Sequence, residues 1–257
     1  MEKTSIRTKA KIKMKNPILV EGLPGIGLVG KIAIDHIIKT KQAKKIANIY
    51  HPQFPPQVLM KKNGVMRLLG MRMYYLPAKK NDILLLAGDV QVQTPEAHFE
   101  LTDKILDYYQ KNGGKQIITL GGYGTGKHAK TPVVYGAATH TELVEKYKKM
   151  GIEFGKTRGS IVGAAGLLLG LGKLRGMQGV CLMGETHGGF IDPKSALELT
   201  NKLAQVLEIE IDTQELQKKV KEGEKFIKKM QEQAAKASGE APAAISRNVD
   251  ELTSYIR

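Results

Sequence analysis

Short, nearly uninterrupted apolar runs separated by longer amphipathic segments are the feature that most constrains the fold of this chain. Ile83–Ala87 and Ile117–Leu120 are two such runs. A strand that is apolar on both sides needs cover on both faces, which is typical of inner strands with helices above and below their sheet. The alternation of these runs with helix-length segments predicts an α/β sandwich.

The expected elements alternate as far as residue 207. Strands are predicted at Pro17–Glu21, Ile46–Tyr50, Val65–Tyr75, Ile83–Gly88, Gln116–Gly121 and Gly179–Gly184. Helices are predicted at Ile26–Thr40, Pro95–Asn112, Thr141–Met150, Ser160–Leu174 and Pro193–Leu207. Thr94 and Asp192 mark two of the helix starts, because each is a capping residue followed by a proline at the first helical position.

Changes in residue composition and hydrophobic pattern divide the chain into four segments. These are a basic N-terminal segment (1–15), an α/β domain (16–212), a C-terminal helix (213–237) and a hinge with a mobile tail (238–257). Leu216, Val220, Ile227 and Met230 follow heptad-like spacing, which predicts a long helix. Its apolar stripe needs a partner, either its own domain or another copy in a homo-oligomer.

The charge of the chain raises the question of nucleic acid. Forty Lys and Arg residues against 25 Asp and Glu give a net charge of +15. The excess is concentrated in residues 1–15 and is otherwise spread thinly, and only 5% of residues are aromatic. Because single-stranded nucleic acid is usually held by aromatic stacking, we favour an acidic protein partner over RNA or DNA.

Cysteine content and hydropathy bear on location. The lone Cys181 cannot form an internal disulfide, which fits a reducing compartment. The longest uncharged run, residues 159–172, is shorter than the roughly 20 residues that a membrane helix needs, and the N-terminus lacks the apolar core of a signal peptide. We therefore expect a cytoplasmic protein without a membrane span.

A glycine-rich motif follows the first predicted strand. Gly25–Gly30 reads G-x-G-x-x-G at the start of a helix, the context of a dinucleotide-binding loop. The acidic residue that usually follows about 20 positions later is missing, and Ile32 stands where a P-loop needs Ser or Thr. The favoured interpretation is a tight strand-to-helix turn with close packing, built on Gly22, Gly25, Gly27 and Gly30.

Three acidic residues lie at the ends of predicted strands, namely Glu21, Asp89 and Glu185. Strand ends of an open α/β sheet converge on the usual ligand crevice, so these carboxylates could form a ligand site with an acid or base role. The alternative is that each caps a helix or binds loop amides. The six histidines show no metal-ligand spacing, there is no nucleophile elbow, and Cys181 lies in an apolar run. We therefore assign no catalytic, cofactor-binding or metal-binding residue.

One longer stretch carries a family resemblance. Read whole, Asn16–Gly30 resembles the opening of the archaeal proteasome assembly chaperone family. Residues 50–56 (YHPQFPP), Ala87–Asp89, Gly121–Tyr123, the glycine-alanine run at 163–168 and 182–186 (LMGET) are similar in content and order. The resemblance covers roughly residues 16–210.

The resemblance implies a phosphorylase-like α/β sandwich without established catalytic residues. It also implies a homo-oligomer that binds proteasome α subunits and promotes formation of the core particle without nucleotide. Assembly and activation of finished particles are both compatible with it. Some members end in a hydrophobic-Tyr-X tail that docks between α subunits; this chain ends in Tyr255, Ile256 and Arg257, with Ile at the position of the motif's Tyr. These three residues are the candidate partner-binding site.

A second hypothesis stays open. The chain could be an enzyme or sensor of nucleosides or nucleotides that uses the Gly25–Gly30 loop with Glu21, Asp89 and Glu185. Ligand-induced stabilisation would distinguish it from the chaperone hypothesis.

Overall fold

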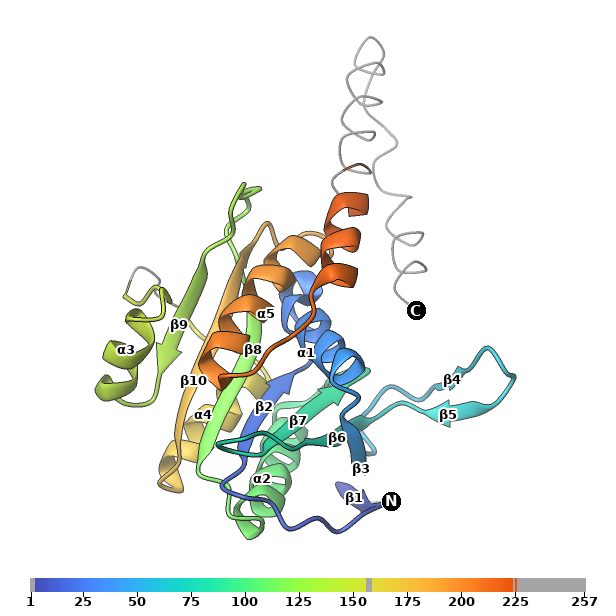
Figure 1. Ribbon diagram of the computed structural model, residues 1–257. Coiled ribbons are helices and arrows are strands. Elements are labelled where there is room, and N and C mark those ends of the chain that lie inside the picture. Colours follow the sequence, from blue (N-terminus) through green and yellow to red (C-terminus); the bar gives the residue numbers. More distant parts are fainter. Residues whose placement is uncertain (1–2, 156–158, 224, 226–257) are drawn as a thin grey trace. The chain divides into compact units, whose positions relative to one another are not determined.

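The computed structural model, which describes residues 3–155, 159–223 and 225, is built around one eight-stranded sheet (Figure 1). Its strand order is β1-β3-β6-β7-β2-β8-β10-β9. The strands are β1 (Ser5–Thr8), β2 (Ile18–Gly22), β3 (Lys44–Tyr50), β6 (Met71–Leu76), β7 (Ile83–Gly88), β8 (Gln116–Gly124), β9 (Val134–Ala138) and β10 (Gln178–Thr186). The inner strands β7, β2, β8 and β10 are parallel, whereas the other pairings are antiparallel.

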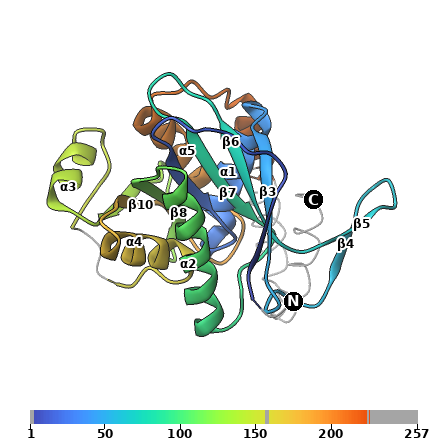
Figure 2. The same ribbon diagram turned by 90° about the horizontal axis from the view of Figure 1, so that it is seen from below.

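Helices cover both faces of this sheet. The helical elements of the α/β domain are the 3-10 turn η1 (Ile26–Leu28), α1 (Val29–Thr40), α2 (Pro95–Lys111), α3 (Thr141–Lys148), α4 (Ala164–Leu174) and α5 (Pro193–Leu207). Figure 2 shows α1 and α5 on one face and α2 and α4 on the other. Alternate side chains of the inner strands feed two cores: Leu19 and Leu84 pack with α2 and α4, and Val20 and Leu85 with α1 and α5. The predicted α/β sandwich is confirmed.

Local signals located several elements correctly. The strand predicted at Ile83–Gly88 and the helix predicted at Pro193–Leu207 have the predicted bounds. Thr94 Oγ1 accepts a hydrogen bond from Ala97 N at 3.3 Å, and Asp192 Oδ1 accepts one from Ser195 N at 2.9 Å. Both side chains therefore cap their helices as their sequence context predicted.

The prediction of one continuous strand at Val65–Tyr75 is wrong. The region instead contains β5 (Met66–Leu68), two buried residues outside either strand, Leu69 and Gly70, and then β6. A Cβ on Gly70 would lie 2.6 Å from the carbonyl oxygen of Ile49, so the chain passes the neighbouring strand too closely for any larger residue. β5 pairs with β4 (Val58–Met60) in a separate hairpin that projects from the body (Figures 1 and 2).

Two strands of the main sheet lay outside the predictions, and both are edge strands. β1 lies within the basic N-terminal segment and pairs antiparallel with β3, and β9 pairs antiparallel with β10. β1 (SIRT) is short and mostly polar, whereas β9 (VYGAA) is apolar but short and interrupted by Gly136, so neither has the continuous apolar run that marks the inner strands.

The described part of the C-terminal region is helical from residue 214 to 223 and at 225. This agrees with the start of the helix predicted at 213–237. Its later turns, the hinge at 238–242 and the tail lie outside the described residues. Within the part of the chain that the structure describes, every helix is too short or too polar to cross a bilayer.

Gly30 offers a test of how closely helix α1 approaches the sheet. A Cβ there would lie 2.4 Å from the carbonyl oxygen of Leu120 in β8. Gly30→Ala should therefore lower the free energy of unfolding by about 1–3 kcal/mol, as overpacking does. Gly170→Ala is the matched control, because Gly170 is an exposed residue of α4 with nothing within 4 Å of its added Cβ, and it should raise stability by roughly 0.5–1 kcal/mol. Urea denaturation measures both, and a Gly30→Ala protein as stable as the parent would contradict the close approach.

Candidate functional site

The glycine motif forms the link between β2 and α1. A Cβ on Gly22 would lie 2.5 Å from the carbonyl oxygen of Gly30, and one on Gly27 would lie 2.9 Å from Thr186 Oγ1. Gly27 also has a positive φ of 61° and accepts a hydrogen bond from Asp192 N at 2.9 Å. A Cβ on Gly25 would make only one distant contact, 4.0 Å from the carbonyl oxygen of Leu23. These contacts favour a turn packed against β10 over an open loop that receives a phosphate.

Glu21 lies inside the core, not in an open crevice. Its side chain is 1% exposed, and Oε1 accepts a hydrogen bond from Leu23 N at 3.1 Å. Oε2 has no hydrogen-bond partner among the described residues. Burial raises the pKa of this carboxyl to about 8, so the folded protein holds it largely protonated at neutral pH.

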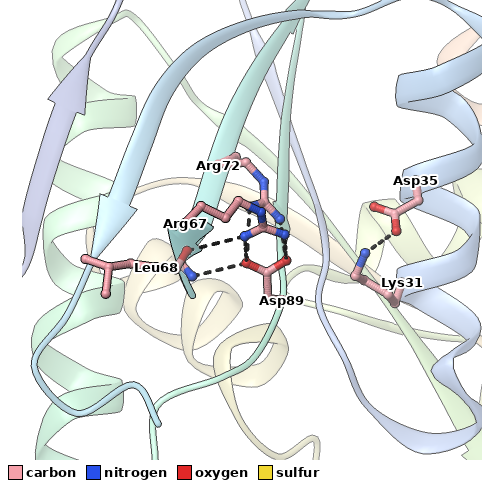
Figure 3. Close-up of polar contacts among 7 residues, drawn as sticks. Lys31, Asp35, Arg67, Leu68, Arg72 and Asp89 are labelled. Carbon is pink, nitrogen blue, oxygen red and sulfur yellow. Dashed lines mark hydrogen bonds and ion pairs between the residues drawn. The ribbon is translucent and has the colours of Figure 1, made fainter. Parts of the chain in front are cut away.

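Asp89 follows β7 and is shared by two arginines (Figure 3). Arg67 donates to its two oxygens at 2.6 and 2.8 Å, and Arg72 donates to the same oxygens at 3.1 and 2.6 Å. Gly70 N adds a third donor at 3.2 Å. Burial alone would raise the pKa of Asp89, but the hydrogen bonds and charges of Arg67 and Arg72 outweigh it and lower the pKa to about 2. The carboxylate is thereby committed to joining β5 and β6 to the end of β7.

Glu185, near the end of β10, holds a loop. Its Oε2 accepts a hydrogen bond from Val133 N at 3.2 Å, and its own backbone N donates to Val133 O at 2.7 Å. His187, two residues on, stacks on Phe190 and packs at a tilt against His128, with ring centroids 4.7 and 5.2 Å away. Glu185 therefore binds a backbone amide of a loop, which is the alternative role that the sequence left open.

Among the described residues, no hydrogen bond or ion pair joins any two of Glu21, Asp89 and Glu185. Two pockets of about 210 and 420 Å³ lie elsewhere, the first beside His51 and Glu100 and the second along β9 beside Phe154. Within residues 3–155, 159–223 and 225, no cluster of three His, Cys, Asp or Glu side chains could hold a metal ion. Tyr255, Ile256 and Arg257 lie outside the described residues.

The sequence predictions missed the β4–β5 hairpin and its exposed face. Its exposed apolar face consists of Val58, Met60, Met66 and Leu68, all more than half exposed. The signal was present: Asn63-Gly64 between two short alternating segments is a strong local indication of a hairpin.

Comparisons with known proteins extend these observations. The model of the PAC2 family matches residues 19–231. The uncharacterized protein MJ1210 of Methanocaldococcus jannaschii is 39% identical over 232 residues, which cover 89% of this chain and 90% of that protein.

Two solved structures from Pyrococcus furiosus are also similar. PbaB, described as an archaeal proteasome activator, is 40% identical with a TM-score of 0.85, over 90% of this chain and 100% of PbaB. PbaA, described as an archaeal homolog of proteasome-assembly chaperone, is 27% identical with a TM-score of 0.77, over 92% of this chain and 95% of PbaA.

The buried Glu21 predicts a specific dependence of stability on pH. The unfolded chain releases this proton near the ordinary pKa of 4.5, and the folded chain near 8. Between these values the folded state binds more protons, so stability should fall by about 1.4 kcal/mol per pH unit as pH rises, and then level off. Glu21→Gln, which stays neutral, should remove this contribution.

Urea denaturation at pH 5 and pH 8 tests this assignment. The fall in unfolding free energy should be much smaller in Glu21→Gln than in the parent, while Glu210→Gln, an exposed glutamate, should leave it unchanged. An equal fall in the parent and Glu21→Gln would show that this carboxyl is not its source.

Proposed function

Because this chain belongs to the PAC2 family, we propose that it is a non-enzymatic chaperone that binds proteasome α subunits and assists formation of the core particle. The observation that carries this proposal is the 40% identity to PbaB over nearly the whole of both chains. The similarity to PbaA, whose description refers to proteasome assembly, supports the same partner. Since PbaB is described as an activator, action on finished particles is the second form that the role could take.

The nucleotide hypothesis receives less support from the residues it needs. Glu21 is buried, Asp89 is held by two arginines and Glu185 binds the backbone of Val133. The Gly25–Gly30 turn packs against Leu120 and Thr186. A site made of these groups would have to release contacts that the fold already uses.

We further propose a homo-oligomer in which the α/β body and the 213–237 helix make the contacts between copies. The tail from residue 243, ending in Tyr255, Ile256 and Arg257, would engage α subunits. An aromatic and an aliphatic side chain can be buried in a pocket, and the terminal carboxylate can be bound by a lysine or backbone amides. Several tails on one oligomer would add avidity to weak individual docking.

Removal of Tyr255–Arg257 tests the tail. A chain ending at Ser254 should bind archaeal proteasome α subunits about tenfold more weakly or worse, because tail avidity is lost, while its own oligomeric state is unchanged. Native mass spectrometry measures both properties, and full-length Thr253→Ala is the matched control. Unchanged binding would move the contact to the body, and failure of the full-length chain to bind would overturn the proposed function.

Nucleotides provide the test against the alternative. A ligand at 100 times its Kd stabilises a folded protein by about 2.7 kcal/mol, which thermal unfolding detects readily. We expect no rise in the Tm of the full-length protein with nucleosides or with mono-, di- or triphosphates. A rise that is lost in Gly27→Ala but retained in Gly170→Ala would favour a nucleotide site at the Gly25–Gly30 turn.

A further inference from the structure

The β4–β5 hairpin presents one purely apolar face. Val58 lies opposite Leu68 and Met60 opposite Met66, so the four side chains form two cross-strand pairs on the same side. They are 51, 56, 78 and 67% exposed, respectively. The other exposed large hydrophobics of the described residues, apart from Val65 in the hairpin turn, are Ile26, Phe99, Val162 and Leu174, each on a different segment. A contiguous apolar face of this kind is typical of an interaction site.

The hairpin is closed at its tip and fastened at its base. At the tip, Gly64 N donates to Lys61 O and Lys61 N donates to Val65 O, both at 2.9 Å, with Gly64 at a φ of +77°. At the base, Arg67 points away from the apolar face and binds Asp89 of the body (Figure 3). An isolated two-stranded hairpin is marginal in water, so this ion pair helps to hold the apolar face outward.

Positive charge lies at both ends of the hairpin. Lys61 and Lys62 are exposed at the tip. Partial burial, followed by repulsion from Lys9, Arg72, Lys61 and Arg67, lowers the pKa of Lys45 in β3, so Lys45 has several cations near it. Asp89, the carboxylate at the base, is already shared by Arg67 and Arg72.

These charges determine what the face can bind. Two copies packed through the same face with their tips together would bring their lysines together, which opposes self-association in that arrangement. Residues 58–68 contain no aromatic side chain on which a base could stack, which argues against nucleic acid. A protein surface with an apolar centre and an acidic rim satisfies both the apolar pairs and the cations around them.

We propose that the β4–β5 hairpin is a docking arm for an acidic protein surface with an apolar centre. Resting on the proposed function, we assign that surface to the proteasome α subunits. The arm would be a second contact, independent of the C-terminal tail.

Two double variants of the full-length chain separate the apolar and the charged contributions. Met60→Ser with Met66→Ser removes apolar contact and keeps the charge; its control is Val162→Ser with Leu174→Ser, at side chains 83 and 84% exposed outside the hairpin. Lys61→Glu with Lys62→Glu reverses the charge at the tip; its control is Lys115→Glu with Lys127→Glu, at exposed lysines of the body. Thermal unfolding should show that all four variants fold as the parent does.

Binding to archaeal proteasome α subunits is then measured by surface plasmon resonance at two salt concentrations. The methionine variant should bind about tenfold more weakly or worse, as expected for the centre of an interface. The lysine variant should associate more slowly and lose salt dependence. Both controls should bind as the parent does.

The other outcomes overturn the assignment in distinguishable ways. If the full-length chain binds and the hairpin variants bind equally well, the docking arm is refuted while the proposed function stands. If the full-length chain does not bind, the proposed function fails and the assigned partner with it. Native mass spectrometry showing that the methionine variant dissociates the homo-oligomer would identify a self-association face instead. Loss of oligouridylate binding in the lysine variant, with α-subunit binding intact, would identify a nucleic-acid site.

Discussion

Burial of the inner parallel strands on both faces is the constraint on which the rest of the structure depends. Ile83–Leu86 of β7 is at most 1% exposed, so neither side of this strand can face water. Two helices must therefore cover each face, and they must approach closely enough to exclude water. On one side, α1 does so through Gly30, which brings the helix against the backbone of Leu120.

The opposite face is held by a polar contact within an apolar layer. Tyr109 of α2 is fully buried, and its hydroxyl donates to Pro17 O at 2.7 Å and accepts from Leu19 N at 3.1 Å. Burial raises the pKa of Tyr109 to about 12, so the hydroxyl stays neutral and keeps its proton for this bond. A Cβ on Gly114 would lie 2.2 Å from the tyrosine ring, which explains why the link from α2 to β8 has a glycine at this position. Helix, strand and turn are thus fixed together by one side chain.

Because helices cover both faces of the sheet, only its strand ends, its edges and its insertions are left for contact with other molecules. In this chain the strand ends are largely occupied: Glu185 binds the Val133 loop, and the glycine turn packs against Thr186. The insertion between β3 and β6 is different, because its apolar face points outward while Arg67 ties it to Asp89. Asp89, which the nucleotide hypothesis needs for a ligand site, is therefore used to anchor the β4–β5 hairpin to the body.

The sequence by itself determined the layered architecture and its best-marked elements. The apolar run at Ile83–Gly88 and the caps before Pro95 and Pro193 act over a few residues, so their signals can be read locally. Only the tertiary structure decided which partners the acidic residues have, because Asp89 meets Arg67 and Arg72 from positions 22 and 17 residues away. It also decided the edges of the sheet: β1 and β9 are strands because β3 and β10 offer them backbone hydrogen bonds, not because their own residues require it. The local residue pattern indicates which face of a helix or strand is buried, whereas pairing between segments distant in the sequence depends on the complete fold.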